Sequence, residues 1–171
     1  MKTSPLVALA LSFVTANACA GYSAVELTDD GAQLMITADD GSKFSAPKSG
    51  DQAGFEKPRI SPDGKNVGWL ALYPNCCASY PLPLGLVILD ESRHMHTFDG
   101  IKIPVFKWCF LPKSASVAYM QAFPHGSNFE HFEARSISSG KLLAQYEYPD
   151  QWPADAIERK RAPSWVRCVE Q

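Results

Sequence analysis

PRISPDGKNVGWLALY, residues 58 to 73, predicts two antiparallel strands joined by a tight turn. The turn is the Pro-Asp-Gly of residues 62 to 64, because proline fixes φ, aspartate bonds the turn backbone and glycine accepts a positive φ. The strand after it, residues 66 to 73, is apolar on both faces, with Val67 and Trp69 on one side and leucines on the other. We therefore expect a central strand that is buried on both sides.

The same pattern returns fifty residues later in KWCFLPKSASVAYMQAF, residues 107 to 123. The aligned pairs are Pro62 with Pro112, Val67 with Val117, Trp69 with Tyr119, Tyr73 with Phe123, and Pro74 with Pro124. Each copy continues into a further strand pair, with predicted hairpin turns at residues 90–92 and 138–140. One unit is thus written twice, over about residues 55–100 and 105–148.

A partial unit precedes these two copies. QLMITADDGSKFSA, residues 33 to 46, has the strand-turn-strand form around Asp39-Asp40-Gly41 and is interpreted as the second half of an earlier unit, about residues 24–50. A repeat of about 50 residues lies in the range expected for propeller blades.

Ser61-Pro62-Asp63-Gly64-Lys65, followed by an apolar strand and a strand-turn-strand, resembles the S-P-D-G-K blade motif of WD-repeat-like β-propeller proteins of the bacterial periplasm. The second copy, LPKSA at residues 111–115, keeps the proline and lacks the aspartate and glycine. The stretch from Tyr73 to Pro83 also resembles a group of uncharacterised exported bacterial proteins. The resemblance implies a propeller-like fold and no particular activity.

Chain length limits how the units are arranged. A closed propeller needs at least four blades, which the chain does not supply at this period. We predict an all-β fold of two blade-like antiparallel sheets and an N-terminal hairpin, packed as an incomplete propeller or a small sandwich. The sandwich, with one core formed by Trp69, Val67, Val117 and Tyr119, is the favoured form. Sheet edges would remain exposed in either form, and a partner protein can pair a strand with such an edge.

The tail, residues 150–171, departs from the repeat. Residues 153–160 predict a short helix, with proline early and acidic residues before basic ones. Residues 162–168 are expected to be extended. Trp165 and Cys168 are expected to attach the tail to the body of the domain.

The first twenty residues predict export. Lys2, the apolar stretch LVALALSFV and the small-residue site Ala18-Cys19-Ala20 form a signal peptide with cleavage after Ala20. An uncleaved anchor is disfavoured because the apolar run is shorter than the ~20 residues that cross a bilayer. Cleavage after Ala18 would instead give a lipoprotein anchored through Cys19. The expected location is the periplasm or the extracellular medium, with residues 21–171 as one domain and no integral membrane segment after cleavage.

Composition excludes several classes of partner. The formal charge of the chain is −2, so no basic excess holds nucleic acid or anionic lipid. No motif for a cofactor, nucleotide or catalytic nucleophile stands out, and no cofactor is expected.

The sequence therefore favours a non-enzymatic binding module that recognises another protein in the periplasm, with an inhibitor or immunity protein as one concrete form. It leaves the oligomeric state open.

Four cysteines remain after cleavage, and in an oxidising compartment they predict disulfides among Cys76, Cys77, Cys109 and Cys168. A bond between neighbours would be strained, so we expect at least one of Cys76 and Cys77 to reach Cys109 or Cys168. A thiolate metal site is disfavoured because no C-x-x-C spacing is present.

Two aligned loops form the predicted recognition surface, one following Tyr73 and the other following Phe123. Because the repeat places both at the same rim, their polar and aromatic residues are candidate binding residues. These candidates are Tyr73, Asn75, Tyr80, His125, Asn128 and Phe129. In the competing interpretation, the rings of Tyr73, Tyr80, Phe123 and Phe129 fold inward and cover the sheet ends.

A different class of function rests on His94 and His96, which lie two apart on a predicted strand and so share one face. A metal- or redox-linked periplasmic protein that uses these histidines, or the Cys76 and Cys77 pair, is the alternative hypothesis. It is disfavoured because imidazole sites need a third ligand, and we predict no metal site.

Overall fold

The computed structural model describes residues 21–75, 79–124, 129–148 and 156–171. The predicted leader with Cys19 lies outside these residues, as do Cys76, Cys77, His125 and Asn128. The first sheet contains β1 (Tyr22–Leu27), β2 (Leu34–Ala38) and β3 (Lys43–Ser45). The second contains β4 (Gly54–Ile60), β5 (Asn66–Tyr73), β6 (Leu82–Asp90) and β7 (Met95–Phe98). The third contains β8 (Val105–Phe110), β9 (Ser116–Ala122), β10 (Glu130–Ser136) and β11 (Leu142–Glu147).

Each sheet is an antiparallel meander whose neighbouring strands follow one another in the chain. The turn from β4 to β5 has the predicted chemistry, since the Asp63 carboxylate accepts bonds from the Ser61 hydroxyl at 2.6 Å and the Lys65 amide at 3.2 Å, and Gly64 has a φ of 73°. The turn at residues 90–92 is built likewise, with the Ser92 amide donating to the Asp90 carboxylate at 2.9 Å. Short-range turn signals therefore placed the hairpins correctly.

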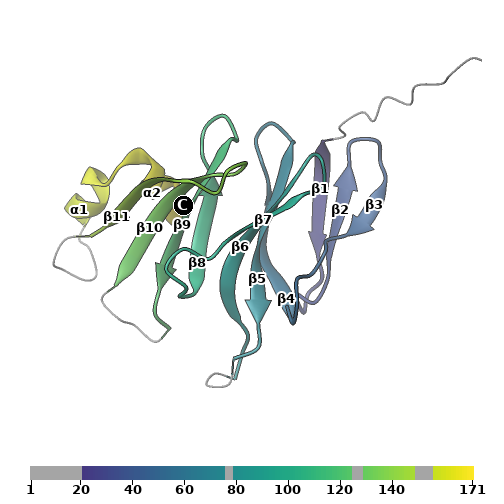
Figure 1. Cartoon of the computed structure of the whole chain (residues 1–171), viewed down its shortest axis with the longest axis horizontal. Helices are drawn as coiled ribbons and strands as arrows, with labels where there is room; N and C mark the ends of the chain where they lie inside the picture. The colour runs from purple at the N-terminus through teal and green to yellow at the C-terminus, as the bar shows by residue number, and fades with distance from the viewer. Residues whose placement is uncertain (1–20, 76–78, 125–128, 149–155) are drawn as a thin grey trace, which may run out of the picture.

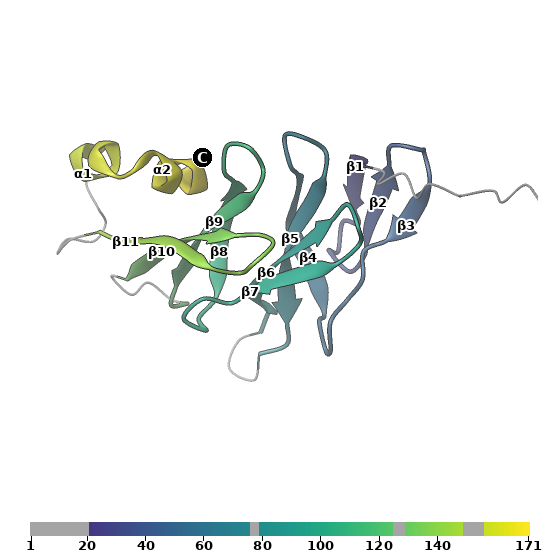
Figure 2. The ribbon, with the colours of Figure 1, turned by 45° about the horizontal axis from the view of Figure 1, so that its top comes forward.

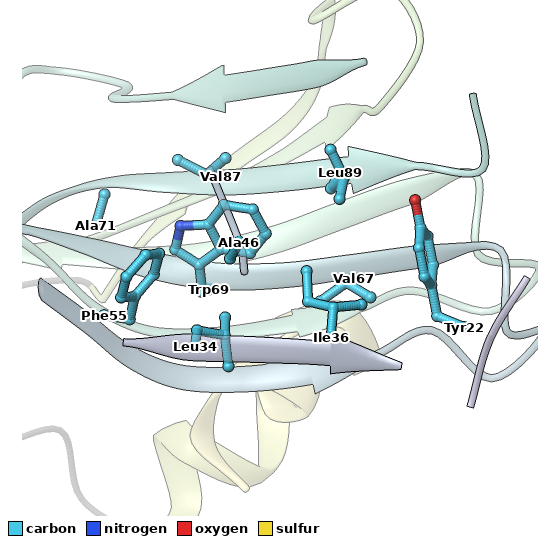
Figure 3. Packing of buried hydrophobic residues seen from close by; sticks show 10 residues of the cluster. All are labelled: Tyr22, Leu34, Ile36, Ala46, Phe55, Val67, Trp69, Ala71, Val87 and Leu89. Carbon is cyan, nitrogen blue, oxygen red and sulfur yellow. The ribbon is translucent and has the colours of Figure 1, made fainter. Parts of the chain in front are cut away.

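The three sheets stack face to face in a row that does not close, as Figure 1 shows. The all-β, blade-like fold is thus confirmed, and its form is the incomplete propeller. The second sheet is buried on both faces, as predicted for β5. One core joins the first and second sheets (Figure 3) and contains Tyr22, Leu34, Ile36, Ala46, Phe55, Val67, Trp69, Ala71, Val87 and Leu89. Another joins the second and third sheets and contains Leu70, Leu86, Ile88, Phe98, Val105, Trp108, Val117, Tyr119 and Ile137.

The single sandwich core predicted from the repeat is therefore wrong. Val67 and Trp69 pack in the first core, whereas Val117 and Tyr119 pack in the second. Successive side chains of a strand point to opposite faces, so β5 contributes Trp69 to one core and Leu70 to the other. The repeated positions are equivalent within each sheet and do not meet across one interface.

The C-terminal segment forms two helices, α1 (Ala156–Arg161) and α2 (Ser164–Glu170), which lie over the outer face of the third sheet (Figure 2). The first occupies part of the predicted helix. The second corrects the prediction of an extended segment at 162–168. Val166 and Val169 are three apart, so a helix turns both toward the sheet, whereas a strand would put them on opposite faces. Both are buried against β8, β9 and β10.

One disulfide joins Cys109 on β8 to Cys168 on α2, with the Cα atoms 6.1 Å apart. The expectation that Cys76 or Cys77 would reach one of these cysteines is therefore wrong, because each already has its partner in the other. The predicted attachment of the tail is confirmed, since Trp165 and Cys168 pack against the buried cluster beneath α2.

The two ends of the row of sheets differ in what covers them. The third sheet is covered by α2. The outer face of the first sheet is polar, with Glu26 and Lys43 paired at 3.1 Å and both largely exposed. Within the described part of the chain, neither end presents a broad apolar face that a fourth blade would have to cover.

Candidate functional site

The strand ends define two opposite rims. We call the ends that carry residues 74–81, 99–104 and 123–129 the link rim, which faces the lower side of Figure 1. The turn rim carries the turns 61–65, 91–94, 111–115 and 137–141 at the other end of the same strands. Because β5 and β9 both run toward the link rim, the two predicted recognition loops leave from the same side of the molecule.

The described candidate residues of these loops differ in exposure. Tyr80 is 50% exposed. Tyr73 is half-buried and packs against the first core, whereas Asn75 and Phe129 are half-buried. The interpretation that the aromatic rings fold inward over the sheet ends thus applies to Tyr73 and does not apply to Tyr80.

Four exposed apolar side chains lie on or beside the three links. They are Tyr80 at 50%, Leu84 at 39%, Ile101 at 43% and Phe123 at 49% exposure. We call these four residues the apolar patch. Exposed apolar side chains that form a contiguous patch commonly mark an interaction surface. The sequence reasoning missed Leu84 and Ile101, because the link between the second and third sheets has no counterpart in the repeat alignment.

Gln121 holds this link in place. Its side chain is fully buried, and its amide nitrogen donates to the carbonyl oxygens of Asp99 at 2.8 Å and Ile103 at 2.6 Å. Its amide oxygen accepts the backbone N–H of Ile101 at 3.1 Å. Three hydrogen bonds from this one buried side chain therefore fix the loop that presents Ile101. Gln121 itself lies two residues before Phe123 in the sequence.

An aromatic row runs inward from the patch along β10. The ring centroids of Phe123 and Phe129 are 5.7 Å apart, and Phe129 stacks on His131 with centroids 6.1 Å apart and planes 5° from parallel. His131 is 5% exposed. The exposed Phe123 is thus supported by a buried imidazole through the ring of Phe129.

His131 in turn lies between two carboxylates. Its Nδ1 is 2.7 Å from Glu147 Oε1 and its Nε2 is 3.2 Å from Glu133 Oε1. Ionised carboxylates only accept hydrogen bonds, so both contacts are hydrogen bonds when the imidazole carries two protons. On its other oxygen, Glu133 accepts the Tyr119 hydroxyl at 2.5 Å and Arg135 Nε at 2.6 Å. Two basic and two acidic side chains are thus joined in one network, which is buried at His131 and Glu133 and exposed at Glu147.

This network shifts the acidity of its members. Burial raises the pKa of the Tyr119 hydroxyl, and the bond to Glu133 raises it further. Burial alone would also raise the pKa of Glu133, but the hydrogen bonds from Arg135, Tyr119 and His131 outweigh it, so the pKa lies below its ordinary value. Glu133 is therefore ionised in the folded protein at neutral pH.

Acid should weaken the fold through Glu133. Because its folded-state pKa is lower than its unfolded value, the ionised group stabilises the fold at neutral pH, and this stabilisation is lost as the pH falls below the ordinary value of 4.5. Glu133→Gln should lower the free energy of unfolding by about 2 kcal/mol near neutral pH, since bonds to a charged group are lost. The difference between variant and wild type should shrink in acid, as measured by urea unfolding.

Glu26→Gln is the matched control, because the Glu26 side chain is 63% exposed in a surface ion pair. It should change the stability by less than about 0.5 kcal/mol at either pH. If Glu133→Gln lowered the free energy of unfolding by the same amount in acid as at neutral pH, this role for the carboxylate would be contradicted.

The structure places the two histidines of the alternative hypothesis beside Asp90. His96 Nε2 lies 2.9 Å from Asp90 Oδ2, and His94 Nδ1 lies 3.9 Å from the same oxygen. Within residues 21–75, 79–124, 129–148 and 156–171, no three His, Cys, Asp or Glu side chains are grouped so as to hold a metal ion. The described helices also include none long and apolar enough to cross a membrane.

Comparisons with known proteins add little to this geometry. No family model and no curated protein match the sequence. Among solved structures, the Cps50 (Swd1) β-propeller domain of Myceliophteria thermophila is 16% identical over 86% of this chain and 50% of that one, with a TM-score of 0.41. A catalytically inactive virginiamycin B lyase of Staphylococcus aureus is 13% identical over 79% and 44%, with a TM-score of 0.44. Kuenenia stuttgartiensis hydrazine synthase is 18% identical over 74% and 37%, with a TM-score of 0.42.

This chain thus spans half or less of each of these proteins. Their activities and ligands do not transfer to it at such similarity.

Proposed function

We propose that this chain is an exported, non-enzymatic binding module whose link rim recognises another protein. The observation that carries the proposal is the apolar patch of Tyr80, Leu84, Ile101 and Phe123. Large aromatic and aliphatic side chains supply most of the energy at protein interfaces, and they do so best on a rigid support. Gln121 and the stacked Phe129 and His131 supply that support.

The finer parts of the proposal rest on the sequence. Export rests on the leader of residues 1–20, and an inhibitor or immunity role in the periplasm rests on small size, export and the lack of catalytic motifs. Two details are compatible with cleavage after Ala20. β1 begins at Tyr22, and a side chain at Gly21 would lie 2.5 Å from the Asp39 carboxylate.

Removing the two exposed rings should weaken partner binding. The intact protein is used to capture its partner from the cell envelope, and the dissociation constant is then measured with the purified partner. Tyr80→Ser combined with Phe123→Ser should weaken binding about thirtyfold or more, as expected when interface anchors worth about 2 kcal/mol are lost. Both side chains are about half exposed, so the fold should be retained.

The control combines Met95→Ser with Leu143→Ser, two comparably exposed apolar residues that follow turns of the opposite rim. It should bind the partner as the wild type does. Equal affinity of the link-rim variant and the wild type would exclude the patch as the binding surface. The intact mass of the recovered protein also tests export, since the proposal requires a chain that begins at Gly21 or, in the lipoprotein form, at a lipidated Cys19.

A further inference from the structure

The turn rim has a cavity of about 300 Å³ between the second and third sheets. It is formed where the turns 61–65 and 90–92 of the second sheet meet the turns 111–115 and 137–138 of the third. Three acidic residues, two lysines and a histidine contribute to its walls. This size lies at the lower end of the range for small-molecule sites, and mixed polar walls of this kind give a site its specificity.

The turn 111–115 on one wall is strained. Lys113 and Ser114 have φ values of 73° and 55°, in the left-handed region that non-glycine residues rarely adopt. They occupy the positions of Asp63 and Gly64 in the repeat. Strained residues of this kind persist where the surrounding structure or the function requires them.

Contacts within the protein account for the conformation of Ser114. It is 3% exposed, its hydroxyl bonds the Asp63 carboxylate, and its carbonyl oxygen accepts the Asn66 side chain at 3.4 Å. Ser114 therefore joins the turns of the second and third sheets. The Lys113 side chain, in contrast, has no hydrogen bond or ion pair within the part of the chain that the structure describes.

The other charged groups of the cavity already have partners, and those of Asp63 include the Ser61 hydroxyl and the Lys65 amide. Lys65 pairs with Glu91 at 3.4 Å. Asp90 accepts His96 at 2.9 Å on one oxygen and the backbone N–H of Ser92 at 2.9 Å on the other. The cavity thus has an uncommitted ammonium group on one wall and ionised carboxylates on another. A simple anion would be repelled by those carboxylates, whereas a ligand that carries both charges can meet the lysine and the carboxylates together.

We propose that this cavity binds a small zwitterion, either a free amino acid or the end of a peptide that carries both charges. The ligand carboxylate pairs with Lys113 Nζ, and its ammonium group lies toward Asp90 and Glu91. This inference does not depend on the proposed function, because the cavity lies on the rim opposite the apolar patch.

The test is a titration of the folded protein, followed by the NMR shifts of the backbone amides of residues 113–115 and 138. The probes are alanine and dialanine, with alaninamide and N-acetylalanine as analogues that each carry one charge. Both zwitterions should give saturable shifts, and each single-charge analogue should bind about tenfold or more weakly, since one bond to a charged group is lost. The tighter of alanine and dialanine identifies the source of the ligand, and either result supports the proposal.

Lys113→Gly is a variant in which zwitterion binding should change while the stability of the fold does not. Glycine takes a positive φ without strain, so the melting temperature should not fall. Zwitterion binding should nevertheless weaken about tenfold or more. Lys102→Gly is the matched control, since Lys102 has a φ of 62° on the opposite rim. It should relieve strain equally and leave zwitterion binding unchanged.

Three outcomes would overturn the proposal. The first is that neither zwitterion shifts the amides of the turn rim. The second is that the single-charge analogues bind as tightly as the zwitterions. The third is that Lys113→Gly binds as well as the wild type.

Discussion

Removal of the Cys109–Cys168 disulfide is expected to destabilise the domain by about 4 kcal/mol, because the bond closes a long loop and restricts the unfolded chain. The two cysteines are 59 residues apart in the sequence. Cys109→Ser with Cys168→Ser removes the bond without leaving a free thiol. Its melting temperature should fall by about 8–16 °C for a domain of this size, as measured by circular dichroism.

The loss of stability in this double variant should be concentrated in the C-terminal helices. Val166 and Val169 alone are a small apolar anchor for α2, and a seven-residue helix is not stable in isolation. Hydrogen exchange should therefore accelerate over residues 164–170 before it accelerates in β5.

Reduction of the wild-type protein provides the control. A reductant should reproduce the loss of stability in the wild type and should have no effect on the double serine variant. A double variant that melts within about 2 °C of the wild type would show that the disulfide does not stabilise the fold.

The second large effect is expected at Gly68, where Trp108 of the third sheet packs against the second sheet. A Cβ atom at this position would lie 2.5 Å from Ile88 Cδ1 and 2.5 Å from the ring of Trp108. Both side chains are fully buried, and the Trp108 indole is also held by its bond to the Lys57 carbonyl at 3.0 Å. Gly68→Ala should therefore force the sheets apart and cost about 3 kcal/mol.

Gly85→Ala is a matched control in the same sheet. A Cβ atom there would meet its nearest neighbour, the Thr97 methyl, at an ordinary contact distance of 3.5 Å. This variant should change the free energy of unfolding by less than about 1 kcal/mol, or stabilise the strand slightly. Urea unfolding of both variants measures the difference. Equal stabilities would mean that the interface between the sheets yields easily and that Gly68 does not set its spacing.

Local features of the chain were predictable because their physics is local. The turn at residues 62–64 follows from Pro, Asp and Gly in sequence, and the buried β5 follows from apolar residues on both of its faces. The shared rim of the two recognition loops followed from the same repeat. Tyr80 was correctly placed on that rim for this reason.

Features that depend on distant contacts were not predictable. Ile101 joins the patch because Gln121, twenty residues away, holds its backbone. Trp69 and Tyr119, aligned by the repeat, lie in different cores because they point from equivalent faces of two successive sheets. The strain at Lys113 has no counterpart in composition or periodicity, since backbone φ depends on what the turn must join.

The sequence by itself determined that this chain folds as repeated antiparallel strand units, because alternation of apolar residues and turn chemistry act over a few neighbouring positions. Tertiary structure decided how those units associate and which surfaces remain. It showed that PRISPDGKNVGWLALY contributes to two cores, that α2 forms by docking and by its disulfide, and that the two rims differ in chemistry. These outcomes depend on contacts between residues far apart in the chain, which no local pattern encodes.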